Sequence, residues 1–113
     1  MFFCTWCRAA PLPAHVSKEI AQLFSYLENS GCQLQRNGTW YEAKDAAAHL
    51  NKKYQYLLDK NLIASSEAFI QKAATVSSMS GIAYQVKCPN AATLESSAWF
   101  RAELSRYRQS GHK

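Results

Sequence analysis

The fold of this chain is decided by the stretch CQLQRNGTWY, residues 32–41. Apolar and polar residues alternate on each side of its centre, which is the pattern of β-strands with one buried face. The central pair Asn37-Gly38 suits a type I′ turn, because both of its residues must adopt positive φ. The stretch therefore predicts a β-hairpin. Since a lone hairpin is marginal in water, we expect it to pack on helices or to gain a third strand.

Helical patterns lie on both sides of this hairpin. Ser17 is suited to cap a first helix, and Gly31 is suited to the left-handed conformation after its C-terminus. Residues 43–59 form the longest helical pattern, and Ser65 is suited to cap a third helix. The side chains expected to face the core from these helices are Ile20, Leu23, Phe24, Leu27, Ala47, Leu50, Tyr54, Leu57, Leu58, Phe69, Ile70, Ala73 and Ala74.

The C-terminal part predicts one more strand and one more helix. A polar loop at residues 76–81 precedes an alternating strand pattern at 82–88, and Thr93 is suited to cap the last helix. The side chains expected inward are Ile82, Tyr84, Val86 and Cys88 from the strand, and Trp99, Phe100, Leu104 and Tyr107 from the helix. The sequence thus predicts a single α+β domain over residues 15–110. It has about four α-helices and a short antiparallel sheet made of the hairpin plus one further strand.

Composition and charge narrow the class of protein. The chain has 113 residues, of which 48% are hydrophobic, and this is typical of one globular domain. Its 13 basic and 8 acidic side chains give a net charge of +5, but the basic residues are scattered along the sequence. Nucleic-acid-binding proteins concentrate such charge on one face, so we expect no nucleic-acid partner. No apolar run approaches the ~20 residues of a membrane span.

The N-terminus and the cysteines predict an exported protein. Residues 1–14 are apolar and then rich in small residues and proline, which indicates the remnant of a secretory signal peptide or a short disordered arm. Cys32 and Cys88 are predicted to form a disulfide, which implies an oxidising compartment. The alternative is that they are two buried free thiols. Cys4 and Cys7 form a C-x-x-C motif, which a redox pair or half a zinc site would use. A redox pair needs a preceding strand, which the sequence does not supply, and a zinc site needs two more ligands, whereas the other cysteines are isolated. We therefore expect no metal and no cofactor.

The chain from about residue 20 to 108 resembles the YfeK-like family, a group of small, predicted periplasmic bacterial proteins. The resemblance implies export and a small, helix-rich fold, and it implies no known reaction. The residues that carry it are Arg36-Asn37-Gly38 followed by Tyr41, His49-Leu50 with Lys53-Tyr54, Phe69-Ile70, Ser77-Ser78 with Ser80-Gly81, Tyr84, and Trp99 with Leu104.

Two polar groups are candidates for chemistry. Asp45 lies one helical turn before His49, and a carboxylate that orients an imidazole is part of a general base. The alternative is a polar pair on a helix surface, and no nucleophile motif completes the set. The loop at residues 78–81 has hydroxyls and a glycine that are able to bind an anion, whereas its simpler interpretation is a turn between a helix and a strand.

Two further patterns concern recognition. Residues 80–84 match the S-G-x-x-Y string of the c-type lysozyme inhibitor family, although those inhibitors are β-barrels and this chain has helical patterns. Trp40 and Tyr41 are neighbours on a strand, so only one of them faces the core. The other, with Arg36 across the turn, is expected to form an exposed aromatic and basic patch, unless both rings pack under helices.

Taken together, the sequence predicts a monomeric periplasmic binding or accessory protein without catalytic activity, whose partner is an envelope protein or glycan. The alternatives are an inhibitor or immunity protein against an envelope-degrading enzyme, and a hydrolase that uses His49 with Asp45. The candidate binding surface consists of Arg36, Asn37, Trp40, Tyr41, His49, Lys53, Ser78, Ser80, Gly81 and Tyr84.

Overall fold

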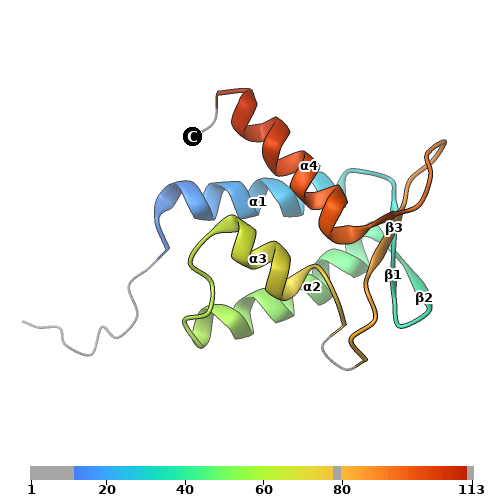
Figure 1. Cartoon of the computed structure of the whole chain (residues 1–113), viewed down its shortest axis with the longest axis horizontal. Helices are drawn as coiled ribbons and strands as arrows, with labels where there is room; N and C mark the ends of the chain where they lie inside the picture. The colour runs from blue at the N-terminus through green and yellow to red at the C-terminus, as the bar shows by residue number, and fades with distance from the viewer. Residues whose placement is uncertain (1–11, 78–79, 112–113) are drawn as a thin grey trace, which may run out of the picture.

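Four helices lie beside a small antiparallel sheet in the computed structural model, which describes residues 12–77 and 80–111 (Figure 1). The described elements are α1 (Ala14–Glu28), β1 (Gln33–Arg36), β2 (Thr39–Glu42), α2 (Ala43–Asp59), α3 (Ser66–Ala73), β3 (Gln85–Lys87), β4 (Leu94–Glu95) and α4 (Ser96–Gln109). The strand order is β2-β1-β3-β4, with every neighbouring pair antiparallel. The predicted α+β class is therefore confirmed, with one strand more than the sequence indicated.

The hairpin forms as its turn residues predict. Leu34 pairs with Tyr41 and Arg36 pairs with Thr39 across β1 and β2. The two residues between the strands have positive φ, 52° at Asn37 and 82° at Gly38, as a type I′ turn requires. β1 also pairs with β3, so the hairpin gains the further strand that its stability needs.

The strand predicted at residues 82–88 is shorter in the structure. Only Gln85–Lys87 pairs with β1, while Ala83 forms an isolated bridge with Val76 and the Ser77 N–H donates to the Ile82 carbonyl at 2.9 Å. The expectation that Ile82 faces the core is wrong, because this bridge turns the segment away from the sheet and leaves Ile82 55% exposed.

The last helix begins later than predicted. Thr93 is not its N-cap, because Leu94 and Glu95 are extended and pair with Val86 and Gln85 as the fourth strand. The helix starts at Ser96, directly after this strand. Its expected inward residues Trp99, Phe100 and Leu104 are buried.

The first helix begins earlier than predicted. Ser17 lies inside α1, which starts at Ala14, and the Pro13 carbonyl accepts hydrogen bonds from the N–H groups of Val16 and Ser17. Ala14 belongs to the stretch that the sequence indicated as a leader or arm, and residues 1–11 lie outside the described part of the chain. The helix ends as expected, with Gly31 at a φ of 71° shortly after it.

The middle helices follow their sequence patterns. α2 spans Ala43–Asp59, the bounds that its pattern predicts. Ser65 caps α3 as predicted, since its hydroxyl accepts a hydrogen bond from the Ala68 N–H at 3.0 Å. The four residues expected on the buried face of this helix are at most 1% exposed: Phe69, Ile70, Ala73 and Ala74.

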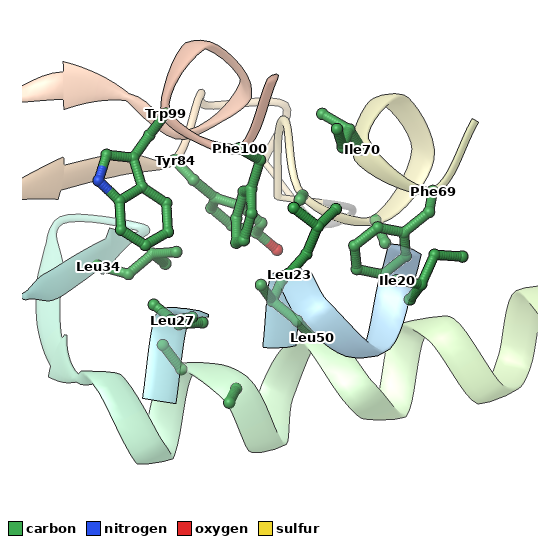
Figure 2. Packing of buried hydrophobic residues seen from close by; sticks show 14 of the residues in the cluster. Ile20, Leu23, Leu27, Leu34, Leu50, Phe69, Ile70, Tyr84, Trp99 and Phe100 are labelled. Atoms are coloured by element: carbon green, nitrogen blue, oxygen red, sulfur yellow. The ribbon is translucent and has the colours of Figure 1, made fainter. Parts of the chain in front are cut away.

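The hydrophobic core lies between the helices and one face of the sheet (Figure 2). Alternation along β1 and β3 places Leu34 and Val86 on this face, where they pair with each other. Large apolar side chains from every helix meet them, and these include Leu23, Leu27, Leu50, Phe69 and Phe100. Removal of this apolar surface from water is the main contribution to the stability of the fold.

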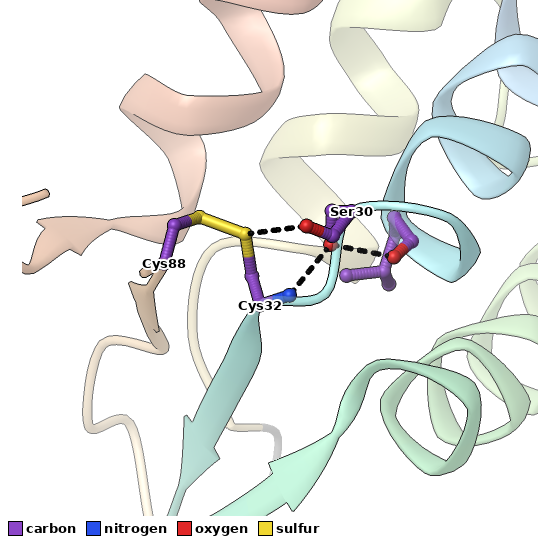
Figure 3. Close-up of a disulfide and its surroundings, with 4 residues drawn as sticks. Ser30, Cys32 and Cys88 are labelled. Atoms are coloured by element: carbon purple, nitrogen blue, oxygen red, sulfur yellow. Dashed lines mark hydrogen bonds between the residues drawn. A yellow bond between two sulfur atoms is a disulfide. The ribbon is translucent and has the colours of Figure 1, made fainter. Parts of the chain in front are cut away.

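A disulfide joins Cys32 and Cys88, as the sequence predicts (Figure 3). Gln33 and Lys87 are paired, so the two cysteines lie at the adjoining position, at one end of the β1–β3 ladder. The Ser30 hydroxyl holds the preceding turn by accepting from the Cys32 N–H at 3.0 Å. The motif of Cys4 and Cys7 lies outside the described residues.

Candidate functional site

The hairpin turn and the serine-containing loop are in contact. The Ser80 hydroxyl donates to the side-chain oxygen of Asn37 at 2.5 Å and accepts from the Ile82 N–H at 3.2 Å. These residues are 43 positions apart in the sequence, and both are exposed. We call the area formed by Arg36, Asn37, Ser80 and Gly81 the turn–loop surface. Ser78, which the sequence also placed here, lies outside the described residues.

Lys53 and Tyr84 support the base of this loop from within. The Lys53 ammonium donates to the Val76 carbonyl at 3.0 Å and to the Tyr84 hydroxyl at 3.1 Å, and it lies 5.0 Å from the centre of the Tyr84 ring. Tyr84 is only 1% exposed. It is therefore an internal anchor for Lys53, and a partner is unable to reach its ring without rearrangement of the core.

Trp40 and Tyr41 lie on opposite faces of the sheet. Tyr41 pairs with Leu34 on the helix side, whereas Trp40 pairs with Gln35 on the outer side. Because Arg36 pairs with Thr39, it shares the face of Tyr41, and the expected patch of Trp40 with Arg36 does not form. The cation over the Trp40 ring is Lys87, whose ammonium lies 4.8 Å from the ring centre.

His49 lies in a shallow hollow of about 220 Å³, where its ring meets that of Tyr41 edge-on at 5.2 Å. Desolvation lowers the pKa of His49, the charges of Arg36 and Lys52 lower it further, and Asp45 opposes them with a smaller effect. These effects favour the neutral imidazole, which is the form that accepts a proton. The described residues that line this hollow include no serine, threonine or cysteine, so the hydrolase hypothesis lacks a nucleophile there.

Sequence reasoning missed a network of charges that joins three helices around one buried carboxylate. Glu19 of α1 is 3% exposed and accepts from Arg108 at 2.8 and 2.9 Å and from the Ser66 hydroxyl at 2.6 Å. Arg108 also binds Glu67 at 2.7 Å. The hydrogen bonds from Arg108 lower the pKa of Glu19 against the opposing effect of burial. The available signal was the position of Glu19 within the apolar stripe of its helix.

A second buried carboxylate joins α1 and α4. Glu103 is 2% exposed and is bound by Arg106 at 2.6 and 2.7 Å and by the Gln22 amide at 2.9 Å. Arg106 lowers its pKa by these hydrogen bonds, against the opposing effect of burial. These contacts use two of the three C-terminal arginines for structure and leave Arg101 exposed.

The described residues contain neither a cluster of metal ligands nor a membrane-spanning helix. Within residues 12–77 and 80–111, no three His, Cys, Asp or Glu side chains gather as metal ligands. In the same part of the chain, no helix has the length and apolar character needed to cross a membrane.

The fold and this surface define a small, disulfide-linked α+β domain with a polar contact between a β-turn and a loop. Residues 14–108 match the model of DUF5329, a family of unknown function, and the chain belongs to this family. No curated protein and no solved structure matches the chain significantly.

Proposed function

We propose that this chain is a YfeK-like exported protein of the bacterial periplasm that acts as a monomeric binding or accessory protein of the cell envelope. The Cys32–Cys88 bond supports export, because such bonds persist in oxidising compartments. A domain of 113 residues buries a modest core, and closure of a loop with a sequence separation of 56 is worth about 4 kcal/mol on the chain-entropy model. This protein therefore depends on the compartment in which its disulfide forms.

The contact between Asn37 and Ser80 carries the proposal of a binding surface. It fixes two segments that would otherwise be independent exposed loops, so a partner meets a preorganised surface and binding costs less conformational entropy. Arg36 lies beside this contact and makes no ion pair within residues 12–77 and 80–111, so its charge is available to a partner.

A pull-down from envelope extract tests this proposal. The double variant R36A/S80A removes one charge and one hydroxyl from the turn–loop surface. The control S17A/K18A removes the same groups from exposed positions on α1, at the far end of the molecule from the hairpin (Figure 1). We expect a partner identified by mass spectrometry to be retained by the native protein and the control and lost with R36A/S80A. Equal retention by all three proteins would contradict the proposal.

The two alternative functions are distinguished by activity assays on the same proteins. An inhibitor or immunity protein would lower the rate of an envelope-degrading enzyme, which an assay with lysozyme and an amidase measures directly. A hydrolase that uses His49 with Asp45 would release product from an envelope substrate, and H49A would abolish this release. We expect neither activity for a binding or accessory protein.

A further inference from the structure

Three lysines converge on a second hollow, which lies on α2 and α3. Its volume is about 260 Å³, and it is lined by Lys52, Lys53, Tyr56, Leu57 and Lys72. We call it the lysine hollow. No local sequence pattern indicates this hollow, because Lys72 is brought to Lys52 and Lys53 only by the packing of α3 against α2 (Figure 1).

Two of the three ammonium groups are held in place by backbone carbonyls. Lys72 donates to the Leu62 carbonyl at 2.8 Å, and Lys53 donates to the Val76 carbonyl and the Tyr84 hydroxyl. An ammonium group has three N–H donors, so Lys72 keeps two and Lys53 keeps one for another acceptor. Because these side chains are already ordered, they lose less entropy when they bind an anion.

Among the described residues, no carboxylate forms an ion pair with a lysine of the lysine hollow. Throughout residues 12–77 and 80–111, the ion pairs are those of Arg106 and Arg108 with Glu19, Glu67 and Glu103. The positive charge extends past the hollow, since Lys52 and Arg36 both lower the pKa of His49. Clustered uncompensated cations attract anions and raise their local concentration.

The remaining wall of the lysine hollow is apolar. Tyr56 is 60% exposed, which is high for a large aromatic side chain, and Leu57 is half-buried beside it. The Lys60 ammonium lies 5.7 Å from the centre of the Tyr56 ring and adds a fourth cation at the edge. A ligand that fits this wall carries an apolar or sugar-like part next to its anionic group.

We propose that the lysine hollow binds the phosphate group of an organic phosphate, with Tyr56 and Leu57 in contact with the part that carries the phosphate. Three cations around one hollow suit a phosphate, which has several terminal oxygens and up to two negative charges, better than a carboxylate with one charge. The ligand is either a soluble phosphate ester or the headgroup of an anionic lipid, because both present the same chemistry. This inference is independent of the turn–loop surface, with which it shares no residue.

Binding of two probes tests the inference. Glycerol 3-phosphate is titrated into the protein and followed by NMR chemical shifts, and sedimentation is measured with phosphatidylcholine vesicles with or without phosphatidylglycerol. We expect K52Q/K72Q to weaken binding at least about fivefold, because each removed cation costs an exposed charge pair. The control K18Q/K44Q removes the same net charge from exposed positions outside the hollow, and we expect it to weaken binding less than about twofold.

Each outcome decides the inference. If K52Q/K72Q weakens binding more than the control does with glycerol 3-phosphate alone, the ligand is a soluble ester. If it does so with anionic vesicles, the ligand is a lipid headgroup. If the native protein binds neither probe, the inference is overturned. It is also overturned if the two double variants weaken binding equally. If loss of the Lys72 hydrogen bond unfolds K52Q/K72Q, the single variant K52Q decides, because Lys52 makes no hydrogen bond or ion pair in the described part of the chain and its replacement leaves the fold intact.

Discussion

At the scale of single residues, the structure explains how the charge of Glu19 is accommodated in a buried position, which the sequence pattern alone does not explain. It lies in the inward stripe of α1 near Ile20 and Leu23, where a charge is costly unless it is paired. Arg108 and Ser66 supply the partners from two other helices. Because 89 residues separate Glu19 from Arg108, no local pattern reveals that they meet.

The first prediction concerns Arg108. R108A leaves the Glu19 carboxylate buried with the Ser66 hydroxyl as its remaining described partner, so we expect the free energy of unfolding to fall by about 2 to 3 kcal/mol. This is less than for a fully buried pair, because the Arg108 side chain is 40% exposed. R101A on the same helix is the control, and we expect a change below about 0.5 kcal/mol. Equal effects in urea unfolding would contradict this role of Arg108.

The second prediction concerns pH. The pKa of Glu19 and that of Glu103 are both lowered in the folded protein from the usual 4.5, chiefly by hydrogen bonds from Arg108 and Arg106. A lowered folded pKa stabilises the protein fully above the unfolded pKa, and this stabilisation is lost as the pH falls through the folded value. We therefore expect the free energy of unfolding to fall steadily below about pH 4.5.

Urea unfolding at a series of pH values measures this dependence. The double variant E19Q/E103Q removes both titrating groups, so its free energy of unfolding should fall less steeply between about pH 4.5 and 2. An identical pH dependence for the variant and the native protein would show that these carboxylates are not the groups responsible.

At the scale of elements, the predictions from sequence succeed where the signal is local. The hairpin, α2 and the Ser65 cap each depend on residues within a few positions of one another, and each forms as predicted. The errors occur where pairing between strands that are distant in the sequence determines the structure. Leu94 is extended because it pairs with Val86, and this pairing moves the start of α4.

The third prediction concerns the hairpin turn. Gly38 has a φ of 82°, and nothing lies within 4 Å of a Cβ atom placed there. G38A therefore strains the backbone without a clash, and we expect it to lower the free energy of unfolding by about 1 to 2 kcal/mol. T39A at the next, exposed position is the control. Thermal unfolding measures both variants, and no difference between them would contradict a type I′ turn at this site.

At the scale of the whole molecule, the sequence names residues of the candidate site but not the contacts between them. The sequence analysis named Asn37, Ser80 and Lys53. Only the structure shows that Asn37 and Ser80 are in contact, because local patterns carry no information on this contact. Tyr84 was expected to face inward and was also named in the candidate binding surface; the structure buries it to 1% exposure, so only its inward placement is confirmed. The lysine hollow was missed, since it requires the packing of two helices.

The disulfide is the feature on which the account of the whole molecule depends. It ties the start of β1 to the end of β3 and so connects the hairpin to the C-terminal half of the domain. Its contribution of about 4 kcal/mol is a large share of the 5 to 15 kcal/mol by which domains are stable. A domain with this design is expected to function in a compartment where the bond is maintained.

The most direct test is peptide mapping by mass spectrometry of the protein isolated from cell fractions, with thiols blocked at lysis and no reductant present. We predict that the protein is recovered from the periplasmic fraction and that one species joins the peptides containing Cys32 and Cys88. Recovery from the cytoplasm with both cysteines carrying the blocking group would contradict the account of an exported, disulfide-linked domain.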